Sequence, residues 1–141
     1  MNKKLVNELI PLAYQELDSV GIAQNGEISK GFRGQIASFG AAIATGSLLA
    51  ASAFFNDQGG SKSERHKLMV AINNMLAYKD MENGCLVQNQ GNTLFDTVKI
   101  WMKAHNGSDR EIKEKVLSCA IALKLAMNLY SLKPEKKNKK G

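Results

Sequence analysis

Basic residues form three local clusters that could bind the phosphate groups of a nucleic acid. The clusters are Lys30 with Arg33, Lys62 with Arg65 and Lys67, and Lys99 with Lys103. For any one cluster alone, a solvated helix face is the better interpretation. Three such clusters on a small chain favour a surface that contacts a sugar–phosphate backbone. Phe32 and Trp101, which stand between cations in the sequence, belong to predicted inward-facing rows, so we expect phosphate contacts with little base stacking.

Residue patterns typical of catalysis or metal binding are missing from the sequence. His66 and His105 have no carboxylate at acid–base or ligand spacing within their own helices. Cys85 and Cys119 stand in unrelated contexts without a CxxC spacing. We therefore predict no enzyme activity, no metal site and no cofactor, and two free thiols in a reducing cytoplasm.

Positive charge is concentrated at the C-terminal end. The net charge is +6, and the segment "KPEKKNKKG" from Lys133 carries five lysines and one glutamate, or +4, which leaves +2 for the rest. The overall basicity is thus mostly a property of this tail, and a nucleic-acid surface has to be argued from local clusters.

The elements that would position these clusters all have helical periodicity. Apolar residues recur at steps of three and four, with Phe32, Ile36, Phe39 and Ile43 as the clearest row. Ser61 and Ser108 begin two capping boxes, Pro11 predicts a kink or break, and "VGIAQNGEIS" is expected to be a loop. No strand is predicted. The expected helices cover about 2–20, 29–46, 47–55, 61–79, 92–105 and from 108 until Pro134.

The fold class that follows is all-α, a compact bundle of about six helices. A single domain is expected at 1–132, followed by a disordered lysine-rich tail at 133–141. The uncharged stretch "IASFGAAIATGSLLAASAFF", residues 36–55, has the length of a membrane span. Its alanine, glycine and serine content and the turn-like triplet Thr45 to Ser47 favour two buried helices instead. Association of the lysine tail with an anionic membrane surface stays an alternative.

The segment "ISKGFRGQIASFGAAIATGSLLAASAFF" resembles the small subunit of the type III-B CRISPR effector, the Cmr complex. The similarity lies in the aromatic–basic start at Phe32 and Arg33, the mid-helix Gly40, and a corner of Gly46 and Leu48 followed by Ala53 and Phe54. The segments "LIPLAYQELDSVGI" and "SKSERHKLMVAINNML" also look like this family. Ser47 departs from the family pattern, in which the corner glycine and leucine are adjacent.

This resemblance implies a non-catalytic helical subunit of a cytoplasmic ribonucleoprotein. Copies of the chain would stack head to tail beside the backbone subunits, with basic faces along the duplex of guide RNA and target RNA. Its partners would be copies of itself, the backbone subunits and both RNAs, with no membrane. Lys30 and Arg33 carry over first, then Lys62, Arg65 and Lys67, whereas Lys99 and Lys103 match no family motif. A helical protein–protein adaptor with a solvated basic tail is the alternative.

Overall fold

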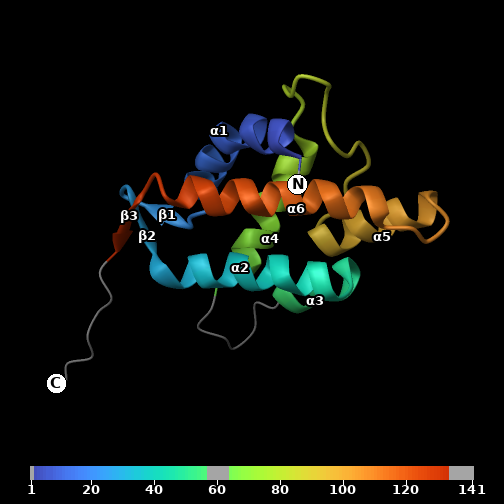
Figure 1. The fold of residues 1–141 in the computed structure, drawn as a ribbon, viewed down its shortest axis with the longest axis horizontal. Coiled ribbons are helices and arrows are strands. Elements are labelled where there is room, and N and C mark those ends of the chain that lie inside the picture. Colours follow the sequence, from blue (N-terminus) through green and yellow to red (C-terminus); the bar gives the residue numbers. More distant parts are fainter. Residues whose placement is uncertain (1, 57–63, 134–141) are drawn as a thin grey trace.

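The computed structural model describes residues 2–56 and 64–133, which form six helices and three short strands (Figure 1). The elements are α1 Lys3–Ser19, β1 Ala23–Gln24, β2 Glu27–Ser29, α2 Lys30–Thr45, α3 Leu48–Phe55, α4 His66–Ala77, α5 Leu94–Ala104, α6 Arg110–Met127 and β3 Ser131–Lys133. The predicted helical fold class is confirmed. The small sheet was not predicted.

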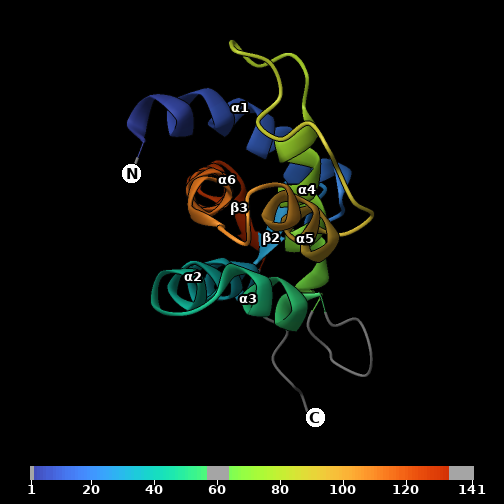
Figure 2. The same cartoon turned by 90° about the vertical axis from the view of Figure 1, so that its right-hand side faces the viewer.

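Helix α6 is the central element of the core. It packs against α1, α2 and α4, and Figure 2, which looks along it, shows these three helices around it. Its residues Val116, Cys119 and Leu123 are 0% exposed, as are Leu9 of α1 and Phe39 of α2. The buried face of α6 carries no charged side chain, because removing an ion from water would cost several kcal/mol.

The apolar stretch at 36–55 forms two core helices joined by a tight corner. Helix α2 ends at Gly46, where an added Cβ would lie 3.0 Å from the carbonyl oxygen of Ala42. Ser47 then caps α3 by accepting a hydrogen bond from the Ala50 amide at 3.1 Å. The prediction of two buried helices is confirmed. Ser47 therefore has a definite role in the corner.

A β-hairpin stands where the sequence predicted a loop. Strands β1 and β2 pair antiparallel, with Ala23 opposite Ile28, around the turn at Asn25 and Gly26. These two residues have φ angles of 55° and 78°, as a type I′ turn requires. The Asn25-Gly26 pair is typical of such a turn, and the sequence-based prediction of a loop did not take it into account.

Strand β3 ties the C-terminal end of the described chain to the hairpin. It pairs in parallel with β2, so that Ile28 lies opposite Leu132 and Ser29 opposite Lys133. Tyr130 stacks on Tyr14 with ring centroids 4.6 Å apart, and its hydroxyl donates to the Tyr14 carbonyl at 2.8 Å. Lys133 was predicted to begin the disordered tail but belongs to this sheet. Residues 134–141 lie outside the described residues.

Several predicted helix limits were wrong. Helix α6 ends at Met127 and not near Pro134, since the chain turns there to reach β3. Helix α4 begins at His66, and the predicted capping serine at 61 lies outside the described residues. Ser108 accepts from the Arg110 amide at 3.3 Å in place of a capping box. Helix α1 continues unbroken across Pro11.

The loop between α4 and α5 is held by a buried polar network. The Thr97 hydroxyl, on a residue that is 0% exposed, donates to the Asn73 side chain at 2.7 Å and accepts from the Gly91 amide at 2.9 Å. The Val87 amide donates to the Leu76 carbonyl at 3.0 Å. These bonds fix the loop against both helices.

Replacing Thr97 by valine should lower the free energy of unfolding by about 1–3 kcal/mol, because the Gly91 amide and the Asn73 side chain lose a buried partner. Urea unfolding of the variant measures this change. Thr45→Val is the matched control, since the exposed Thr45 hydroxyl bonds only to the Ala41 carbonyl one turn away. Equal midpoints for the two variants would contradict the role assigned to the network.

Candidate nucleic-acid interface

The start of α2 presents two cations beside small residues. Lys30 is exposed and Arg33 half-buried, and Gly34, Ala37 and Ala41 are exposed on the same helix. Within residues 2–56 and 64–133, neither Lys30 nor Arg33 has a carboxylate within ion-pair distance. Their charges are therefore not neutralised by the described part of the protein, and the small neighbours leave room for a phosphate strand.

The small sheet brings Lys133, the first residue of the lysine-rich tail, next to the start of α2. Because Ser29 lies opposite Lys133 in the β2–β3 pairing, the chain leaves β3 next to the first residue of α2. Four further lysines follow within the next seven residues of the sequence. No sequence pattern indicated this pairing, because it joins positions about a hundred residues apart.

The start of α4 also lies at this end of the molecule. A cavity of about 300 Å³ is lined by Ser29 and Phe32 near the start of α2, by Glu64 just before α4, and by Lys133. The carboxylates of Glu27 and Glu64 line it too, so the cavity itself is unsuited to an anion. Phosphates are expected at the surrounding cations.

Arg65 and Lys67 are both engaged in intramolecular contacts. The Arg65 guanidinium lies 4.3 Å from the centroid of the Phe54 ring and 5.5 Å from that of Phe55. The Lys67 ammonium lies 3.1 Å from a Glu64 carboxylate oxygen and 3.4 Å from the Gly21 carbonyl oxygen. Lys67 thus joins the start of α4 to the loop after α1. Lys62 lies outside the described residues.

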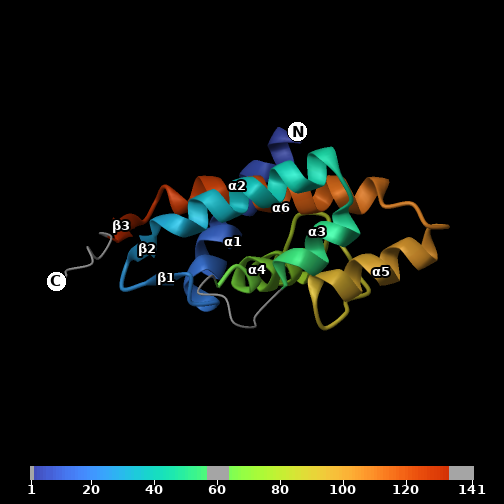
Figure 3. The ribbon, with the colours of Figure 1, turned by 90° about the horizontal axis from the view of Figure 1, so that it is seen from below.

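The third cluster is on α5, at the end of the molecule opposite the sheet (Figure 3). Lys99 lies 3.8 Å from an Asp96 carboxylate oxygen and 5.3 Å from the centroid of the Phe95 ring. Lys103 is exposed. The structure therefore gathers Lys30, Arg33, Arg65 and Lys67 toward one region and leaves Lys99 and Lys103 apart from it.

Aromatic rings lie against two of the cations, and the sequence-based prediction did not include these contacts. Arg65 stacks on Phe54, whose side chain is 62% exposed, and Lys99 lies over Phe95. The contact between Phe54 and Arg65 joins the end of α3 to the start of α4. The helical pattern of the sequence does not predict this contact. Phe54 is an exposed ring that sequence reasoning placed only in a packing motif.

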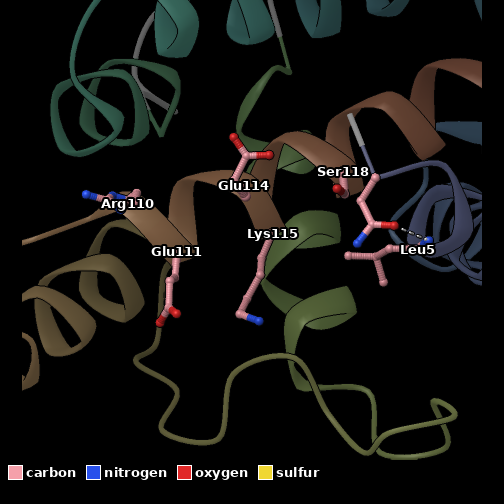
Figure 4. A pocket seen from close by; sticks show the side chains of 7 residues that line it. Leu5, Arg110, Glu111, Glu114, Lys115 and Ser118 are labelled. Carbon is pink, nitrogen blue, oxygen red and sulfur yellow. Dashed lines mark hydrogen bonds between the residues drawn. The ribbon is translucent and has the colours of Figure 1, made fainter.

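A second cavity, of about 280 Å³, lies between the start of α1 and the first half of α6. Figure 4 shows that Glu111 and Lys115 extend to one side of α6, whereas Glu114 points the other way. The Asn2 side chain caps α1 by accepting from the Leu5 amide at 3.0 Å. The polar residues around this cavity therefore have structural roles or carry charges of both signs, and their arrangement gives no reason to assign a ligand.

The two thiols differ in reactivity. Burial raises the pKa of the Cys119 thiol from 9.0 to about 12, opposed by the charge of Lys115. Cys119 is 0% exposed, as expected for a residue on an apolar row, whereas Cys85 is half-buried in the α4–α5 loop. Among the described residues, no group of three or more acidic, cysteine or histidine side chains could hold a metal ion.

A disulfide-exchange reagent should therefore modify one thiol rapidly in the native protein, because a protonated, buried Cys119 supplies no thiolate. Absorbance of the released chromophore counts the thiols, and the second should appear only in denaturant. Cys85→Ser should abolish the rapid phase. Rapid reaction of both thiols in the folded protein would contradict the burial of Cys119.

Lys30 and Lys67 should respond differently to the same loss of charge. Lys30→Gln should weaken RNA binding and leave stability within about 0.5 kcal/mol. Lys67→Gln should cost up to about 1 kcal/mol of stability through its pair with Glu64 and reduce RNA binding less. Fluorescence anisotropy with a labelled RNA and urea unfolding measure the two effects. A larger loss of RNA binding for Lys67→Gln would contradict this assignment.

Comparisons with protein families, curated proteins and solved structures found no match for this chain. None of the described helices combines the length and apolar character needed to cross a membrane. The function has to be argued from the residues and their arrangement.

Proposed function

We propose that this chain is the non-catalytic small subunit of a type III-B CRISPR ribonucleoprotein. It stacks with copies of itself in a filament and contacts the backbone of the guide–target RNA duplex to support target binding. The proposal rests on the resemblance at residues 28–55 and on the basic end of the molecule described above.

The single observation that carries the proposal is the meeting of Lys30 with the root of the lysine-rich tail. The pairing of Ser29 with Lys133 brings Lys133 next to the start of α2, and Lys30 and Arg33 have no acidic partner in the described chain. Cations on an exposed helix end contact phosphates of any sequence. This matches a subunit that supports duplexes formed by many different guides.

A partly exposed apolar row on α6 supports the protein contacts that stacking needs. Leu117, Ile121 and Leu125 are spaced by one helical turn, and Leu117 and Ile121 also pack against the edge of the core. The first two are half-buried and Leu125 is 43% exposed. The same row also favours the second candidate function, a helical adaptor that binds another protein through α6 while the basic residues are merely solvated.

The test is target RNA capture by the assembled effector containing Lys30→Glu and Arg33→Glu together. Capture should weaken, and the logarithm of affinity should fall less steeply with the logarithm of salt concentration. The slope should decrease by about 0.7–0.9 for each phosphate that the variant no longer neutralises. Lys3→Glu with Lys4→Glu is the matched control, because it reverses two exposed charges on the first turn of α1.

Unchanged RNA capture by the Lys30 and Arg33 variant would contradict the proposal. Pull-downs that resist both salt and nuclease would then favour the adaptor, and Ile121→Asp should abolish them. A circular dichroism spectrum like that of the unmodified chain is required of every variant.

A further inference from the structure

A surface pocket on the far side of the molecule combines aromatic, amide and apolar groups. It has a volume of about 210 Å³ and lies between the α4–α5 loop and α5. The loop contributes Cys85, Leu86, Val87, Gln88 and Asn89, and the helix contributes Ile100, Trp101, Ala104 and the following His105. It is smaller than the roughly 300–1,000 Å³ typical of pockets that enclose a whole drug-sized ligand. A single planar group projecting from a larger ligand suits it better.

The rings of Trp101 and His105 form a fixed aromatic wall. They stack with centroids 4.1 Å apart and planes 8° from parallel. The His105 Nδ1 lies 2.8 Å from the Trp101 carbonyl oxygen. Since a carbonyl oxygen only accepts, Nδ1 carries the proton and, in the neutral ring, Nε2 is an acceptor. The backbone bond therefore sets both the orientation and the tautomer of the imidazole.

The opposite wall is held in place by hydrogen bonds. The Val87 amide donates to the Leu76 carbonyl at 3.0 Å, and the Gln90 side chain donates to the Val87 carbonyl at 2.7 Å. The Thr97 network fixes Gly91 further along the same loop. The Gln88 and Asn89 amides, each with donors and an acceptor, are thus carried on an anchored segment.

The lining of the pocket does not repel a nucleotide, because no acidic side chain is among the described residues that line it. The exposed Lys103 is two residues from both Trp101 and His105 and therefore lies on the other side of α5. An aromatic surface with adjacent amides is the arrangement with which proteins hold an unstacked base.

We propose that this pocket takes one base of a single-stranded RNA segment, stacked against the Trp101–His105 pair. This rests on the proposed RNA-binding function and adds to it a site for unpaired RNA. Gln88 and Asn89 can each offer a donor or an acceptor to the edge of a base. The pocket therefore prefers a strand with bases to an abasic strand and discriminates only weakly among the bases.

Trp101 is the single tryptophan of the chain, so its fluorescence reports on the pocket directly. The intact protein is titrated with a short oligoadenylate and with an abasic strand carrying the same number of phosphates. The oligoadenylate should quench Trp101 emission and bind about 5- to 150-fold more tightly, the range expected for stacking of one base on an aromatic side chain. The abasic strand should leave the emission unchanged.

Two variants test the base contact. Ala104→Phe, at an exposed position on the pocket rim, should fill the pocket and bring oligoadenylate affinity down to that of the abasic strand. Ala50→Phe, exposed on α3 and outside both proposed RNA surfaces, is the matched control and should change nothing in the emission response. His105→Ala should reduce the preference for the base while the protein stays folded.

Equal affinity for the two strands, with Trp101 emission unchanged by either, would overturn the base pocket and leave the backbone contacts at Lys30 and Arg33 standing. Loss of binding to both strands would overturn the pocket and the proposed RNA-binding function together. Retained quenching in Ala104→Phe would show that the emission change comes from elsewhere and would also overturn the pocket.

Discussion

The burial of one face of α6 against α1, α2 and α4 is the constraint on which the rest of the structure depends. That face is made of apolar residues and Ser118, so every charged residue of the helix is excluded from it. The same requirement orients α2, because Phe32, Ile36, Phe39 and Ile43 must point inward. Lys30 is therefore on the exposed face of α2, and Arg33 lies at the edge of that face. The position of these cations is a consequence of packing.

Backbone pairing in the small sheet adds what helix packing alone does not supply. Helix packing fixes the cations of α2, and the β2–β3 ladder brings Lys133 to them. The stacked pair of Tyr14 and Tyr130 supports that return by joining α1 to the segment after α6. The basic end is therefore assembled from both ends of the sequence. The proposed base pocket is formed separately from the basic end, by a loop that is anchored to α4 and α5.

The parts of the fold that depend on local periodicity could be predicted from the sequence. The six helices, the corner at Gly46 and the burial of Cys119 follow from apolar spacing and helix-end residues. The hairpin was missed because its strands are too short for a period-two pattern, although Asn25-Gly26 marked the turn. Strand β3, the Arg65–Phe54 stack and the contact of Lys67 with the Gly21 carbonyl depend on three-dimensional proximity. The pocket was missed because Trp101 was expected to point fully inward.

Two surfaces of different chemistry would allow one small chain to bind RNA and protein at once. In the proposed function, the cations at the sheet end contact RNA, whereas the outer row of α6 contacts another polypeptide. The most direct measurement is the chemical-shift change of backbone amides in an isotope-labelled sample of the 15.4 kDa protein as RNA is added. The account predicts changes at residues 27–34, at 131–133 and around the α4–α5 loop, all reduced by salt. Changes confined to the outer face of α6, or none at saturating RNA, would contradict it.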